Sequence, residues 1–162
     1  MARSSGGTPH PTHGRGSLRE ALSRRVVVAD GAMGTMLQAA DPSLDDFQGY
    51  EGCNEILNVT RTDVVAGVHD AYFAVGVDCV ETNTFGANLA NLGEYDIPER
   101  IFELAEAGAV IARQVADDWA SPGRPRWVLG SVGPGTKMKR VLPADSSGCP
   151  VMMSASASKP FW

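Results

Sequence analysis

The chain has 162 residues, of which 43% are hydrophobic, so it is long enough to build the core of one ordinary domain. Its net charge of -5 and its pI near 5.1 argue against nucleic-acid or anionic-membrane binding and favour a small-molecule partner. It has no apolar run of about 18 residues and no hydrophobic signal segment, so we expect a cytoplasmic protein without a membrane partner.

The first 16 residues contain almost nothing that could be buried. Residues 1–16 are mostly Gly, Ser, Thr, Pro, His and Arg, a composition that predicts a disordered tail because no burial offsets the loss of chain entropy. His10 and His13 flank a proline and have no carboxylate or thiol beside them. We therefore interpret these histidines as part of the tail and not as metal ligands.

A helix and a strand are predicted next. Ser17 and Glu20 have the spacing of a capping box, which indicates the start of a short helix. The β-branched run Val26–Val28 then predicts a buried strand. The polar and glycine-rich residues 30–35 that follow predict a tight loop.

A second strand is predicted after a long loop and a second helix. Residues 41–59 are rich in turn formers and show neither helical nor strand periodicity, so they predict a connecting loop. Thr60 and Asp63 form a second capping signature, and Gly76 closes a helix with apolar residues at helical spacing. Residues 77–81 then predict a buried strand.

The third strand follows the longest predicted helix. Pro98 suits a first helical position, and residues 101–120 continue with apolar residues three and four apart. Residues 127–134 predict a strand that breaks at a Gly-Pro pair. Strands that alternate with helices imply a parallel sheet in an α/β fold, either a doubly wound sheet or an eight-stranded barrel. All three strands end in polar, glycine-bearing loops, which predicts a site at that edge.

Four segments in chain order resemble a known family. They are ADGAMGTMLQ, GCNEILNVTRTDVV, GVDCVETNTFGANLANL and LGSVGPGTK. Together they are similar to the start of the homocysteine-binding domain of the cobalamin-dependent methionine synthases, within the homocysteine S-methyltransferase family. The resemblance runs from about Arg25 to Lys137, and four motifs in register are far more specific than one glycine signature. We place the domain at residues 17–137 and an irregular tail, unlike the family, at 138–162.

The resemblance implies a fold, a reaction and its cofactors. The fold is a (β/α)8 TIM-type barrel, of which this chain would contain the first three parallel strands and their helices, less than half of the closed sheet. The family transfers a methyl group from methylcobalamin, recharged by methyltetrahydrofolate, to the thiol of homocysteine. Zinc keeps that thiol ionised at neutral pH. The partners would be homocysteine, the missing barrel half, and the folate and cobalamin domains.

The resemblance also assigns substrate contacts. Asp30 would hold the homocysteine ammonium group, and the backbone amides around Gly31 and Ala32 would receive its carboxylate. The remaining pocket residues lie at the end of the second strand, where they would contact the substrate or orient a neighbour: Glu81, Asn83 and Thr84. Without the resemblance, Asp30 could instead cap its own turn, and the other three could equally satisfy loop amides.

Ligands for the zinc ion are not recognisable in this sequence. The family ligands are three cysteines, one alone and two adjacent, whereas Cys53, Cys79 and Cys149 are widely spaced. An odd number at such spacing also fits no disulfide framework, so we expect reduced thiols. His69 lies inside the second predicted helix, without a partner at i+4, and is interpreted as an exposed or packing histidine. We therefore assign no catalytic or metal residue.

Several functions remain open. By the resemblance, the chain is a methionine synthase fragment that is inactive alone, its tail arising from a frame change or belonging to a genuine short protein. A second possibility is a non-catalytic module that binds homocysteine or another protein. A third is part of a cobalamin-independent homocysteine methyltransferase that uses S-methylmethionine or betaine.

Overall fold

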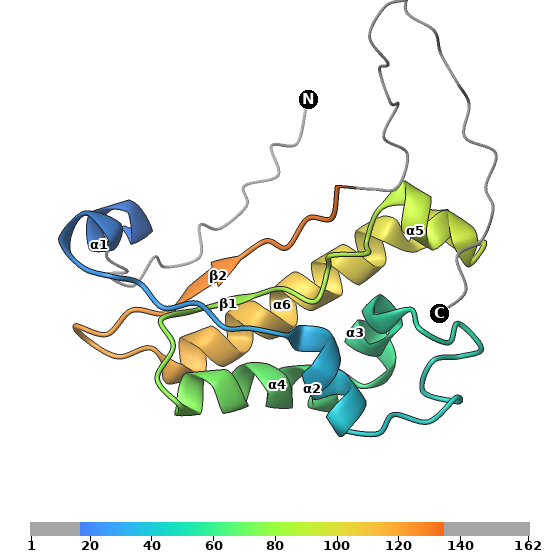
Figure 1. Ribbon diagram of the computed structural model, residues 1–162, viewed down its shortest axis with the longest axis horizontal. Helices are drawn as coiled ribbons and strands as arrows, with labels where there is room; N and C mark the ends of the chain where they lie inside the picture. Colours follow the sequence, from blue (N-terminus) through green and yellow to red (C-terminus); the bar gives the residue numbers. More distant parts are fainter. Residues whose placement is uncertain (1–16, 135–162) are drawn as a thin grey trace, which may run out of the picture.

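The computed structural model describes residues 17–134 (Figure 1). The tails predicted at 1–16 and 138–162 lie outside these residues, as does Cys149. The elements in chain order are α1 (Leu18–Arg24), α2 (Met33–Ala39), η1 (Asn54–Ile56), α3 (Leu57–Thr60), α4 (Thr62–Ala74), β1 (Cys79–Glu81), α5 (Leu89–Glu94), η2 (Pro98–Arg100), α6 (Ile101–Trp119) and β2 (Trp127–Leu129).

The sheet is parallel, as the alternation of strands and helices predicted. β1 and β2 pair in parallel with Cys79 opposite Trp127 and Glu81 opposite Leu129. On the other side of β1, Ala29 forms an isolated parallel bridge to Cys79. The three extended segments therefore lie side by side in chain order, with β1 in the middle.

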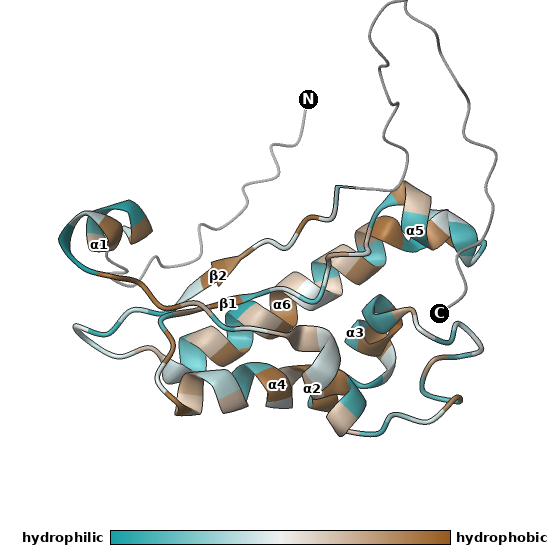
Figure 2. Ribbon diagram, viewed as in Figure 1, coloured by the Kyte–Doolittle hydropathy of each residue, from teal (hydrophilic) through white to brown (hydrophobic). Residues whose placement is uncertain are grey.

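The buried strand predicted at Val26–Val28 is wrong as stated. Only the bridge at Ala29 pairs with β1, and Val26 and Val28 are 82% and 52% exposed. Figure 2 shows this hydrophobic segment as the chain leaves α1 and runs beside β1. Within the described part of the chain these valines are thus left largely uncovered. A β-branched run favours a buried strand, but its burial also requires other elements that pack over it.

Two long helices form one layer beside the sheet. α4 and α6 pack against each other and against β1, on one face of the strands (Figure 1). α6 buries a row of mostly small residues at four-residue spacing, namely Leu104, Gly108, Ala112 and Ala116. This row permits close packing, and α6 is the longest helix among residues 17–134, as predicted. No helix among residues 17–134 is long and apolar enough to cross a membrane.

Both predicted capping boxes are corrected by the structure. Ser17 stands at the N-cap of α1, but its side chain makes no capping hydrogen bond. Thr60 ends α3 and its hydroxyl donates to Ile56 O at 3.1 Å, so α4 begins two residues later, at Thr62. The predicted end of this helix at Gly76 is confirmed, since Gly76 follows α4 with a φ of +103°.

Short helices occupy segments that the sequence predicted as loops or turns. α2 lies partly within the predicted loop 30–35, η1 and most of α3 lie in the predicted loop 41–59, and α5 lies in a segment for which no helix was predicted. Each carries an apolar anchor that is at most 1% exposed, such as Leu37, Leu57 or Leu92. Tertiary burial stabilises these helices, which are too short to show a clear period.

Candidate functional site

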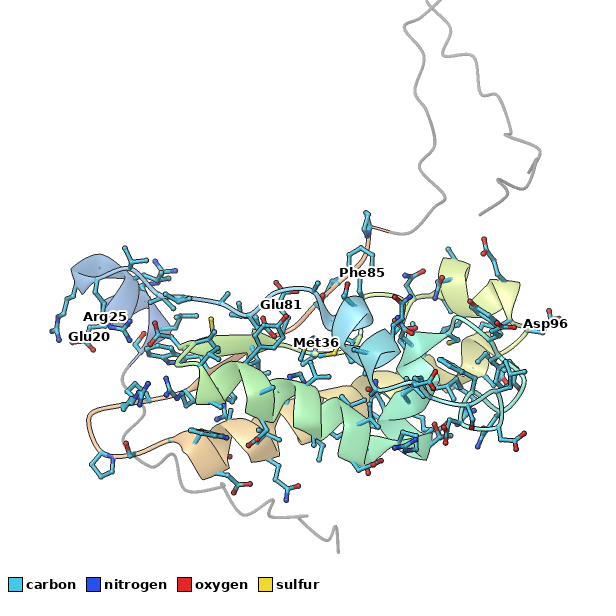
Figure 3. All side chains as sticks on the ribbon, turned by 60° about the horizontal axis from the view of Figure 1, so that its bottom comes forward. Glu20, Arg25, Met36, Glu81, Phe85 and Asp96 are labelled. Atoms are coloured by element: carbon cyan, nitrogen blue, oxygen red, sulfur yellow. The ribbon has the colours of Figure 1, made fainter. Side chains whose placement is uncertain are left out.

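The carboxyl ends of the three extended segments meet at one edge. Because the bridge at Ala29 and the β1–β2 ladder are parallel, Asp30, Glu81 and Ser131 follow neighbouring strands on the same side. In Figure 3, Glu81 and Phe85 both lie on the side of the strands away from α6. The predicted clustering of the three strand-end loops is thus seen in the structure.

Asp30 is the half-buried acid of this edge. Both of its carboxylate oxygens lie 3.0 Å from the Glu81 amide nitrogen, which donates to them from the neighbouring strand. Burial raises the pKa of Asp30, while the hydrogen bond from Glu81 opposes that rise. The side chain therefore links two strands, in addition to any capping of its own turn. It presents a carboxylate at the rim of the sheet, where a cationic group can approach.

Gly31 and Ala32 connect Asp30 to α2. Both are exposed, and Ala32 is the N-cap residue of α2. A Cβ on Gly31 would lie 3.4 Å from the Tyr72 hydroxyl, a tight but tolerable contact. Neither amide donates to another backbone group within residues 17–134. This exposed backbone is thus accessible beside the Asp30 carboxylate.

A closed set of hydroxyl contacts joins the ends of β1 and β2. The Ser131 amide donates to Thr82 Oγ1 at 3.0 Å, and Thr84 Oγ1 donates to the Ser131 carbonyl at 2.8 Å. The Thr82 and Thr84 hydroxyls are 2.6 Å apart, so Thr82 is left to donate to Thr84. The Ser131 hydroxyl donates to Glu81 Oε2 at 3.1 Å. Glu81 is exposed and Thr84 half-buried, so both reach the edge.

Asn83 points into the interior. It is 5% exposed, and its side-chain amide donates to Asn54 O and to Asn58 Oδ1, each at 2.9 Å. Asn58 in turn donates to Asn83 O at 2.8 Å and to Leu104 O at 3.0 Å. Of the two roles expected for Asn83, this placement favours orienting its neighbours over contacting a ligand. The network anchors the end of β1 to α3 and α6.

Three polar residues around the site were not singled out from the sequence. Asn54, Glu55 and Asn58 belong to the motif GCNEILN, which sits in a segment that composition assigned to a loop. The structure buries Glu55 and Asn58 to 6% and 1% exposure beneath the loop after β1. The sequence feature that could have indicated them is the placing of these polar residues among apolar ones such as Ile56 and Leu57, which is typical of a buried polar cluster.

The described residues do not fit a zinc site. Cys53 and Cys79 are free and buried, one before η1 and the other in β1. Burial raises the pKa of Cys79, and raises that of Cys53 to about 11, which opposes the thiolate form that binds zinc. No group of three potential ligands occurs within residues 17–134. We therefore derive no chemical step through a metal.

Two surface hollows lie away from the strand ends. One, of about 590 Å³, is lined only by α6 residues that include Val110 and Arg113. The other, of about 300 Å³, lies between α4 and α6 and is lined by residues such as Thr62 and Ile111. They lie on the helical layer and contain none of the candidate site residues.

Comparison with known proteins identifies relatives of this chain. The family model described as homocysteine S-methyltransferase matches residues 27–157. Methionine synthase of Mycobacterium tuberculosis (strain H37Rv) is 64% identical over 121 residues, and that of Mycobacterium leprae is 60% identical over 121 residues. Each match covers 75% of this chain and 10% of the relative. The chain thus spans about a tenth of the length of these curated relatives.

Solved structures agree on the fold. The homocysteine methyltransferase MmuM from Escherichia coli is similar in its metallated and oxidized forms, with TM-scores of 0.58 and 0.59 and 24% identity. The similarity covers 72% of this chain and 41% and 40% of those chains. The family match runs beyond Lys137, where the recognised motifs end, so the domain boundary placed there remains a prediction.

Proposed function

Because this chain belongs to the homocysteine S-methyltransferase family, we propose that its strand-end edge binds homocysteine as the methionine synthases do. The observation that carries the proposal is the half-buried Asp30 carboxylate at the rim of a parallel sheet. A primary ammonium group approaching there would gain a charge-assisted hydrogen bond. The proposal concerns binding of the amino-acid end of homocysteine, which is what the described residues at this edge can contact.

The neighbouring groups suit the rest of the amino acid. The exposed backbone at Gly31 and Ala32 lies beside Asp30, where amides can donate to the ligand carboxylate. Glu81 and Thr84 would line the same edge, held by the contacts to Ser131. Asn83 would support the site from the interior, because its side chain ties the end of β1 to Asn54 and Asn58.

We further propose that the described residues form the first three strands of an eight-stranded barrel. The consecutive order of the parallel segments, with α4 and α6 on one face, supports a barrel over a doubly wound sheet, which carries helices on both faces. The exposed Val26 and Val28 would then face the remaining barrel strands, which supply the missing cover. The partner of the described residues would then be the remaining half of the barrel.

The complete reaction requires groups beyond these residues. As the family resemblance implies, we propose that the complete reaction is methyl transfer from methylcobalamin, recharged by methyltetrahydrofolate, to the thiol of homocysteine. Zinc held by the later barrel half and separate folate and cobalamin domains would take part in it. This chain's own residues would bind and orient the amino-acid end of homocysteine. We propose a cytoplasmic location because buried free thiols such as Cys53 suit a reducing compartment.

Calorimetric titration of the 162-residue chain with homocysteine tests this function. We expect the wild-type chain to bind homocysteine saturably without zinc. In Asp30→Asn the binding free energy should be weaker by about 1.5–3 kcal/mol, the contribution of a hydrogen bond to a charged group. The matched control is Asp118→Asn, which removes an exposed carboxylate on α6 and should bind like the wild type. Absence of binding by the wild type, or equal binding by Asp30→Asn, would contradict the proposal.

A further inference from the structure

A buried carboxylate lies beneath the loop that follows β1. Glu55, in η1, is 6% exposed, and its Oε1 accepts a hydrogen bond from the Gly86 amide at 2.7 Å. Its Oε2 lies 3.7 Å from Cys53 Sγ. Burial keeps that thiol protonated, so it can donate to Glu55. An apolar residue would fill this place without the desolvation cost of a carboxylate, which points to a role for the hydrogen bond to Gly86.

Gly86 is held from two directions. While Glu55 accepts its N–H, Asn91 Nδ2 in α5 donates to its carbonyl at 3.0 Å. A Cβ on Gly86 would lie 2.5 Å from Asn91 Nδ2 and 2.6 Å from Glu55 Oε1, so a side chain there would displace these two partners. We call Glu55, Gly86 and Asn91 the loop clamp. It ties the loop after β1 to two separate elements.

The other side of the same loop is tied to the segment after β2. The Gly133 amide donates to Phe85 O at 3.0 Å, and a Cβ on Gly133 would lie 2.3 Å from that oxygen. Thr84 Oγ1 donates to the Ser131 carbonyl. Phe85 nevertheless leaves 61% of its surface exposed. The backbone of residues 84–86 is therefore held on both sides, while the aromatic ring is largely exposed at the edge (Figure 3).

We propose that Glu55 is a positioning residue for ligand binding. By accepting the Gly86 N–H, it fixes residues 84–86 in the conformation that presents Thr84 and Phe85 at the strand-end edge. Homocysteine then meets a prearranged surface, and the loop loses little conformational entropy on binding. The inference rests on the proposed function, since it names a residue that supports the same site from beneath.

Two substitutions at Glu55 separate the hydrogen bond from the volume of the side chain. Glu55→Leu removes the acceptor, and Glu55→Gln retains an oxygen that can accept from Gly86. In the full chain we expect the leucine variant to bind homocysteine about tenfold more weakly, the effect of losing one hydrogen bond of ordinary strength. The glutamine variant should restore most of the affinity. Glu103→Gln, which alters a half-exposed ion pair on α6, is the matched control.

Hydrogen exchange of the Gly86 amide, followed by NMR without ligand, reports the clamp directly. It should be faster in Glu55→Leu than in the wild type or Glu55→Gln. Unchanged exchange or unchanged affinity in the leucine variant would overturn the inference. If that variant does not fold, Asn91→Ala opens the other half of the clamp and must weaken binding for the inference to stand. A wild-type chain that does not bind homocysteine would instead refute the proposed function itself.

Discussion

His69 makes the stability of the core around α4 depend on pH. It is 0% exposed, and neither ring nitrogen has a hydrogen-bond partner among the described residues. Burial lowers the pKa of this imidazole from 6.5 to about 4. Because the folded pKa lies below the unfolded one, the unfolded chain binds the proton more tightly. The contribution to stability is present above pH 6.5 and is lost as the pH falls towards 4.

The size of the effect follows from the two pKa values. At 1.36 kcal/mol per pKa unit, the difference between 6.5 and about 4 corresponds to about 3 kcal/mol, of which about 2 kcal/mol is lost by pH 5. His69→Leu removes both orphaned nitrogens and the titration. We therefore expect this variant to be at least as stable as the wild type at pH 7, and to gain a further 2 kcal/mol or so relative to it at pH 5.

Urea unfolding at pH 7, 6 and 5, followed by far-UV circular dichroism, measures this difference. Titration of all other groups is common to both chains and cancels in the comparison. His10→Gln, a substitution outside the described residues, is the control and should follow the wild type. An equal loss of unfolding free energy from pH 7 to pH 5 in the wild type and His69→Leu would refute the reasoning.

Three further substitutions test the packing and the ionic contacts. Gly108→Ala places a Cβ 2.7 Å from Asn58 Nδ2 and should lower the free energy of unfolding by about 1–3 kcal/mol. Gly67→Ala, at an open helical position, should raise the free energy of unfolding by up to about 1 kcal/mol. If urea titration gave the same change for both substitutions, the close packing at Gly108 would be contradicted. Asp78→Asn removes the negative charge and one of the two oxygens that accept the paired hydrogen bonds from Arg25, at 2.7 and 2.9 Å. Since Arg25 lowers the pKa of Asp78, the resulting fall in melting temperature should be larger at pH 7 than at pH 3, and an equal fall would count against the pairing.

The location of the candidate site could be predicted from the sequence, but not the direction of each side chain. Polar residues after successive strands must gather at one edge when the strands are parallel, and Asp30, Glu81 and Thr84 do so. Asn83 turns inward because Asn54 and Asn58, which precede it by 29 and 25 residues, accept its hydrogen bonds. Hydrogen-bond partners so far apart in the sequence cannot be recognised from the local pattern of residues.

The sequence by itself determined the alternation of helices and strands, the parallel sheet and the family, because periodicity and motif spacing are local properties that survive in the linear chain. Only the tertiary structure decided which of these residues are covered. The valines at 26 and 28 have the composition of a core strand and yet lie exposed, while the polar Glu55 lies in the interior. Burial depends on which elements pack over a residue, and each hydrogen bond in the interior depends on partners that only folding brings together.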